Sequence, residues 1–143
     1  MLTHREQVLA AMASVSPDGK WLALAGQKDA GQTYTRTTNA IWLLSSAGEL
    51  RSLESPPQQA RNPSYSPDGS WLAFTSTRRN PQQLAGAFII KPDGTGLRQV
   101  APNDLNASHP VWSPDGKQLV FSARRLKDPA PRGIAIIEIS TTL

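Results

Sequence analysis

Residues 65–74 are Tyr-Ser-Pro-Asp-Gly-Ser-Trp-Leu-Ala-Phe, and similar segments occur twice more in the 143-residue chain. The second Ser-Pro-Asp-Gly follows the first by 50 residues (66 − 16), and the third follows the second by 47 (113 − 66). Self-similarity at this spacing is the signature of a repeat architecture. The candidate structural turns are Ser16, Pro17, Asp18 and Gly19; Ser66, Pro67, Asp68 and Gly69; and Ser113, Pro114, Asp115 and Gly116.

Each copy has the composition of a β-hairpin turn. Proline presets φ at the second turn position, aspartate tolerates the third, and glycine supplies the left-handed residue that closes the turn. Apolar segments follow at 21–24, 71–74 and 118–121, and again at 41–44, 88–90 and 134–137. Fourth strands are expected at 50–53 and 97–100. The pattern therefore predicts four-stranded antiparallel meanders of about 47 to 50 residues, the length of a propeller blade.

These units resemble TolB-like β-propeller repeats, whose hallmark is an aromatic-Ser-Pro-Asp-Gly turn followed by a Trp/Leu/Ala/Phe strand. Residues 89–101, Ile-Ile-Lys-Pro-Asp-Gly-Thr-Gly-Leu-Arg-Gln-Val-Ala, are similar to the second half of such a blade. Residues 2–24 also resemble the lead-in to the first blade of prolyl-oligopeptidase-type serine peptidases. The resemblance implies an all-β, partial TolB-like propeller of about three blades, half of a six-bladed ring. It specifies the fold more closely than the function.

The expected blades cover residues 14–55, 62–101 and 109–143, and the third lacks its outer strand. Residues 1–13 are expected to form either a lead-in strand or a short helix with a capping box at Thr3 to Glu6. Two explanations of the incomplete ring stay open. The chain is a piece of a longer propeller, which we favour, or two copies close a six-bladed ring in which each N-terminal strand completes the partner's last blade.

The repeated Ser and Asp residues do not point to catalysis, because a catalytic constellation is normally built once whereas these residues recur in every blade. The chain has no Gly-x-Ser-x-Gly motif and no cysteine, and only His4 and His109 are available as a base. We therefore expect no catalytic residue, no cofactor and no metal in this chain. His109, in the connection that enters the third blade, is expected to be a hydrogen-bonded or solvated loop histidine; the alternative is that it lines a central channel.

The charges are unevenly divided between the two faces of the expected propeller. The net charge of +4 and the pI of 9.9 are only mildly basic. The face opposite the Ser-Pro-Asp-Gly turns holds nine basic and three acidic residues, whereas the turn face holds three basic and five acidic ones. Equivalent ends of the second strands form a candidate partner-binding basic rim, which consists of Arg78, Arg79, Arg124 and Arg125.

Two interpretations of this rim stay open: its arginines are solvated loop charges, or they bind an acidic protein partner, since arginine forks bind carboxylates in bidentate fashion. Nucleic acid is disfavoured because the loops lack interleaved aromatic residues for base stacking. The expected function is a non-catalytic module for protein-protein interaction or scaffolding. The alternative is the N-terminal propeller half of a prolyl-oligopeptidase-type serine peptidase whose α/β-hydrolase domain is not in this chain.

No apolar run approaches the roughly 18 residues of a membrane span. His4, Arg5 and Glu6 stand where a secretory peptide needs apolar residues. The expected location is the cytoplasm if Met1 is the natural start, and the periplasm if the chain is part of an exported TolB-like protein. Four tryptophans are expected to pack blade against blade, each costing about 3 to 5 kcal/mol when truncated to alanine: Trp21, Trp42, Trp71 and Trp112.

Overall fold

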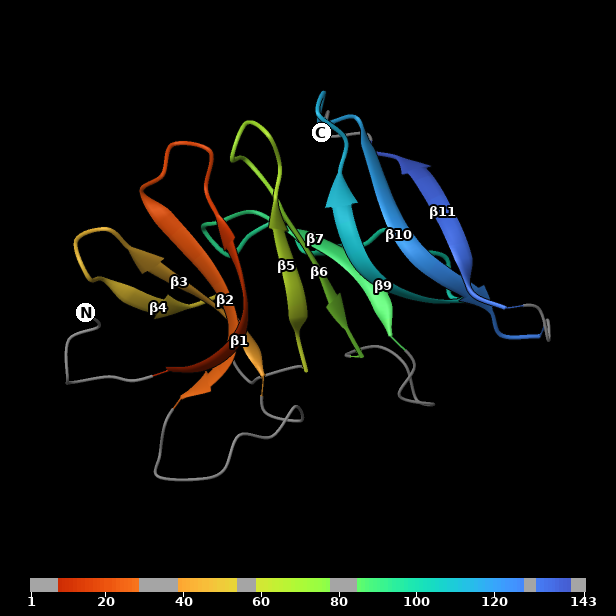
Figure 1. The fold of residues 1–143 in the computed structure, drawn as a ribbon, viewed down its shortest axis with the longest axis horizontal. Helices are drawn as coiled ribbons and strands as arrows, with labels where there is room; N and C mark the ends of the chain where they lie inside the picture. Colours follow the sequence, from red (N-terminus) through yellow and green to blue (C-terminus); the bar gives the residue numbers. More distant parts are fainter. Residues whose placement is uncertain (1–7, 29–38, 54–58, 78–84, 128–130, 140–143) are drawn as a thin grey trace.

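The computed structural model describes residues 8–28, 39–53, 59–77, 85–127 and 131–139. Over these residues the chain forms β-strands and no helix. The strands make three antiparallel sheets that stand side by side in chain order (Figure 1). The all-β class expected from the repeats is therefore correct.

Each sheet is a meander in which strands that follow one another along the chain also pair. The first sheet contains β1 (Val8–Val15), β2 (Trp21–Lys28), β3 (Ala40–Ser45) and β4 (Leu50–Ser52). The second contains β5 (Arg61–Tyr65), β6 (Leu72–Ser76), β7 (Gly86–Ile90) and β8 (Arg98–Gln99). The third has three described strands, β9 (Leu105–Trp112), β10 (Gln118–Arg125) and β11 (Gly133–Glu138).

The first strands of the first and third sheets begin earlier than the expected blades. β1 pairs with β2 from Val8 opposite Lys28 to Val15 opposite Leu22, so residues 8–13 belong to the first sheet and form no helix. β9 likewise begins at Leu105, before the expected start at 109. A turn motif locates a hairpin, but the reach of its strands depends on the partner that supplies their hydrogen bonds. Residues 1–7 lie outside the described part of the chain.

The Ser-Pro-Asp-Gly motif closes each hairpin through hydrogen bonds that the serine and aspartate share. In the second copy the Ser66 hydroxyl donates to Asp68 Oδ1 (2.7 Å) and accepts from the backbone N–H of Trp71 (2.9 Å). The Asp68 carboxylate also accepts from the backbone N–H of Ser70 (3.0 Å). Equivalent bonds occur in the other two copies. Gly69 takes a φ of 75°, which its lack of a side chain permits.

The turns lie in a row on one face of the molecule. A Cβ at Gly69 would lie 3.4 Å from Pro17 of the preceding turn, and one at Gly116 would lie 3.6 Å from Pro67. Each proline therefore lies beside the glycine of the next turn, so the repeated motif contributes to contacts between sheets as well as within them.

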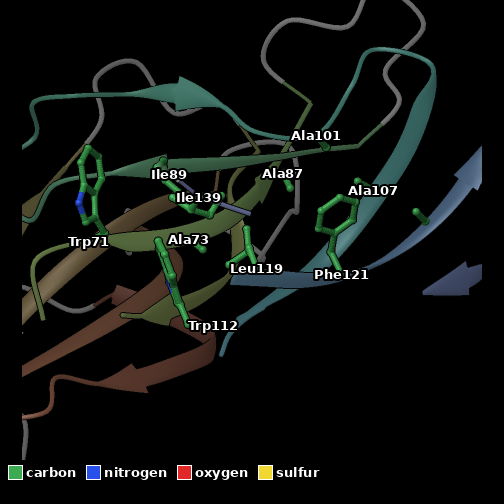
Figure 2. Packing of buried hydrophobic residues seen from close by; sticks show 11 residues of the cluster. Trp71, Ala73, Ala87, Ile89, Ala101, Ala107, Trp112, Leu119, Phe121 and Ile139 are labelled. Atoms are coloured by element: carbon green, nitrogen blue, oxygen red, sulfur yellow. The ribbon is translucent and has the colours of Figure 1, made fainter. Parts of the chain in front are cut away.

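The middle sheet is buried on both faces, since it lies between the other two. All the residues of β6 and β7 are buried. Leu72 and Phe74 pack toward the first sheet, and Phe74 stacks on Phe88 with the ring centroids 5.8 Å apart. Ala73 and Ile89 face the third sheet. There they pack with Leu119, Phe121 and Trp112. Figure 2 shows these side chains, which belong to the contact between the second and third sheets.

The four tryptophans, all of which were expected to pack between blades, differ in their surroundings. Trp71 and Trp112 are buried between the second and third sheets, and Trp21 is half-buried against the cluster between the first and second. Trp42 lies on the other face of the first sheet, half-buried, and donates its indole N–H to the carbonyl of Gly26 (3.1 Å). No described sheet covers that face, so the packing of Trp42 against another blade stays a prediction.

The outer face of the third sheet is apolar and open among the described residues. Val111, Val120 and Ile136 lie side by side across β9, β10 and β11. Ile136 is 62% exposed and its neighbour Ile134 is 73% exposed. Val120 and Ala73 occupy equivalent positions of the repeat, because each follows its turn serine by seven residues. Ala73 of the second sheet is buried against the third sheet. The open face of the third sheet is therefore equivalent to the face through which the second sheet contacts the third.

Candidate basic pocket between the inner strands

The inner strands β1, β5 and β9 are neighbours, and each is irregular at the same point of the repeat. Met12, Asn62 and His109 each lie four residues before the serine of their own turn. The register of pairing shifts at this level in all three sheets. Asn62 has a φ of 53° and His109 a φ of 56°, in the left-handed region that Asn and His enter more readily than most residues. These irregularities are β-bulges, which redirect side chains.

Proline follows both of these residues, at Pro63 and Pro110. A proline has no N–H to give to a strand ladder, so it is tolerated where pairing is already interrupted. The two dipeptides Asn-Pro and His-Pro therefore fix the bulges in the second and third sheets at equivalent places.

The bulges border a cavity of about 400 Å³ between the inner strands. Its described lining residues carry two guanidinium groups, one imidazole, polar groups and a thioether, and none is a carboxylate: Met12, Arg61, Asn62, Ser108, His109, Ser122 and Arg132. Arg61 and Arg132 form no ion pair within the described residues. The cavity, which we call the inner basic pocket, is therefore a cationic site without an internal counter-charge in this part of the chain.

Hydrogen bonds hold several walls of the pocket. Ser108 Oγ accepts from Arg132 Nη1 (3.4 Å) and is 3.1 Å from His109 Nδ1. The His109 backbone N–H donates to the buried Thr75 hydroxyl (3.1 Å). Asn62 Nδ2 donates to Met12 Sδ (3.0 Å), whereas Asn62 Oδ1 is buried with no hydrogen-bond partner among the described residues.

Strand direction places the pocket arginines on the face opposite the turns. β5 and β11 both begin at that face, with Arg61 as the first residue of β5 and Arg132 just before β11. β10 ends there, at Arg124 and Arg125. Arg61, Arg124, Arg125 and Arg132 therefore share the face that the sequence marks as basic.

The proposed rim is only partly described. Arg124 and Arg125 are exposed at the end of β10, and Arg125 pairs with Asp104 (3.2 Å), which is also exposed. Such a pair between exposed charges contributes little. Arg78 and Arg79 lie outside the described residues, so the rim of four arginines stays a prediction.

Sequence reasoning missed the inner basic pocket as a unit, although it counted Arg61 and Arg132 in the basic face and placed His109 near a channel. The available signal was the common position of Met12, Asn62 and His109 relative to the turn serines. Their convergence depends on how the three inner strands approach one another, which the repeat spacing does not specify.

A second cavity, of about 520 Å³, lies between the first two sheets at the turn face. Its charged groups are already engaged. Arg51 donates to the carbonyl of Pro92 (2.6 Å) and lies over the Trp21 ring, 5.4 Å from its centroid, while Asp18 and Asp68 are bonded within their turns. This cavity is therefore a weaker candidate for ligand binding than the inner basic pocket.

The described residues contain no group of three or more His, Cys, Asp or Glu side chains placed to hold a metal ion. None of their segments is a helix long and apolar enough to cross a membrane.

The three-sheet arrangement is found in known propellers. An Agrobacterium tumefaciens protein assigned as TolB matches with a TM-score of 0.73 and 20% identity, over 92% of this chain and 47% of its own. An oligogalacturonate lyase in complex with manganese matches with 0.71 and 20% identity, over 96% and 40%. The propeller domain of the Trilobed protease from Pyrococcus furiosus matches with 0.66 and 17% identity, over 92% and 39%.

No protein-family model matches the sequence, and no curated protein matches it significantly. The chain spans less than half of each of the three solved structures. Its fold is that of part of a TolB-like β-propeller, which also resembles the propellers of peptidases. Both enzymes and TolB proteins share this fold, so the fold alone does not define an activity.

Proposed function

We propose that the chain is a non-catalytic propeller module that binds an acidic protein partner through its basic face. The observation that carries this proposal is the inner basic pocket, in which Arg61 and Arg132 lie on one face with no carboxylate among the described lining residues. An uncompensated cationic concavity attracts anionic groups and accelerates their association. Arg124 and Arg125 extend the positive surface beyond the pocket.

Capture of a partner tests this proposal. The chain is immobilised, proteins retained from a lysate of the source organism are identified, and the affinity of each is measured again with purified components. Charge reversal at the four rim positions, Arg78, Arg79, Arg124 and Arg125, is expected to weaken binding of the true partner at least tenfold. If the wild type and this variant retain the partner equally well, the rim arginines do not bind it and only increase solubility.

The matched control reverses charges on the turn face. Lys20 and Lys117 are both exposed and directly follow their turns, so Lys20→Glu together with Lys117→Glu changes charge without touching the basic face. This variant is expected to bind the partner within about twofold of the wild type. Loss of binding in this control instead would place the interaction on the turn face.

A second candidate function is the propeller part of a serine peptidase. It is favoured by the match to the Trilobed protease propeller over 92% of this chain. In that case the propeller restricts access to a catalytic domain encoded elsewhere in the gene. Sequencing the gene beyond residue 143 tests this function: a Gly-x-Ser-x-Gly motif in a following α/β domain supports it, and a stop codon directly after residue 143 rejects it.

Where the chain occurs by itself, we propose that two copies associate and close a six-bladed ring. The support is the open apolar face of the third sheet, together with Val15 of the first sheet, which is 63% exposed. Soluble proteins rarely leave such contiguous apolar surface open to water, and exposed sheet edges favour association.

A further inference from the structure

We propose that the inner basic pocket is a carboxylate-binding site that takes an acidic side chain of a peptide segment. This inference rests on the proposed function and deepens it, because it names which group of the partner is recognised and where. It places the specific contact between the inner strands, while the rim adds a general attraction for the same acidic partner.

The donors of the pocket match an anion. Arg61 and Arg132 approach from different sheets, and each guanidinium can present two parallel N–H groups to the oxygens of a carboxylate. Ser122 and His109 add polar groups to the same wall. A cavity of about 400 Å³ is at the small end of the range for ligand sites, which suits one or two side chains rather than a folded domain.

The walls of the pocket are held in place before any ligand arrives. Ser108 is buried and positions both Arg132 and His109, and the backbone of His109 is anchored on buried Thr75. Holding donors in place lowers the entropy that binding must otherwise overcome. The pocket is therefore better prepared for an anion than the rim, where Arg125 already pairs with Asp104.

Two features of the pocket wall lower stability, and neither is needed to close the sheets. Asn62 and His109 have left-handed backbone angles, and Asn62 Oδ1 is buried without a partner among the described residues. The equivalent position in the first sheet is Met12, for which no positive φ is recorded. Strained backbone angles and unpaired buried groups are concentrated at binding sites, where they orient side chains toward a ligand.

The test uses the full chain and an acetylated, amidated hexaglutamate peptide as the probe, with binding measured by calorimetry at fixed ionic strength. Arg61→Gln with Arg132→Gln is compared with Arg124→Gln with Arg125→Gln. Both double variants remove two positive charges from the same face, so general attraction affects them equally. Ser122→Asp, which keeps both arginines and adds a carboxylate to the pocket, is the second variant, and circular dichroism checks that each variant is folded.

We expect the pocket double variant and Ser122→Asp each to raise the Kd for the peptide at least tenfold, while the rim double variant, which loses only the general attraction, raises it clearly less. Inorganic phosphate is expected to compete only weakly. Equal weakening in the two double variants, or no binding by the wild type, would overturn the proposal. If phosphate binds more tightly than the peptide, the proposal of a carboxylate ligand is overturned in favour of a phosphate ligand. Partner capture by the basic face is measured separately, so it can succeed even if this site fails.

Discussion

A single serine in each turn performs two tasks, and this is where the repeat is most sensitive to substitution. Ser16 Oγ donates to Asp18 Oδ1 (2.6 Å) and accepts the backbone N–H of Trp21 (2.9 Å). Removing the hydroxyl leaves that N–H without its partner in a part-buried place, and an unpaired buried donor costs about 1 to 3 kcal/mol.

Ser16→Ala is therefore expected to lower the free energy of unfolding by about 1 to 2 kcal/mol in urea denaturation. The matched control is Ser46→Ala, since Ser46 is exposed in the neighbouring turn and is expected to change stability by less than about 0.5 kcal/mol. Equal effects of the two substitutions would show that the shared bonds of Ser16 do not stabilise the turn.

The same serine affects the ionisation of the turn aspartate. The hydrogen bond from Ser16, followed by that from the Lys20 backbone, holds the pKa of Asp18 below 3.8. A lowered folded-state pKa contributes stability that is complete above the unfolded pKa and is lost as the pH falls through the folded value. Ser16→Ala is expected to raise the pKa of Asp18 toward 3.8, as measured by NMR titration. An unchanged pKa would contradict the assigned cause.

At the scale of the element, the sheets are held together by side chains that alternate between the two faces of each strand. Two tryptophans show the difference between a face that lies between two sheets and a face that no described sheet covers. Trp71 is 5% exposed between the second and third sheets, whereas Trp42 is half-buried on a face that no described sheet covers.

Trp71→Ala is expected to lower the free energy of unfolding by about 3 to 5 kcal/mol, because it leaves a cavity between two sheets. Trp42→Ala is expected to cost clearly less, since the lost side chain was already partly hydrated. Urea denaturation followed by circular dichroism measures both. Equal losses would mean that another element covers Trp42.

At the scale of the whole molecule, the open face of the third sheet determines how the chain associates. The isolated chain is expected to have a mass near twice 15.5 kDa in light scattering. Ile134→Lys with Ile136→Lys is expected to return it to a single chain, because charges cannot be buried against a second sheet without a large cost.

Leu126→Lys serves as the control for this variant, since Leu126 lies beyond β10 and is only 36% exposed. It is expected to leave the mass unchanged. A folded wild-type chain that has the mass of one copy would rule out the proposed two-copy ring.

The repeat, the turn chemistry and the class of fold follow from the sequence alone. Ser-Pro-Asp-Gly acts through bonds among neighbours in the chain, so its effect can be predicted without knowing what lies across the sheet. The apolar segment at 71–74 likewise predicted a strand, which the structure shows as β6. The residues that form the basic face were also countable from the chain.

Three features could not be predicted from the sequence: how far the inner strands extend, which tryptophans are covered, and that Arg61, His109 and Arg132 line one cavity. All three depend on contacts between sheets. A bulge at Asn62 or His109 directs a side chain toward residues about fifty positions away, and no local pattern specifies that distance or direction. The blades were therefore predictable from local hydrogen bonds, whereas the pocket is formed by the packing of one blade against another.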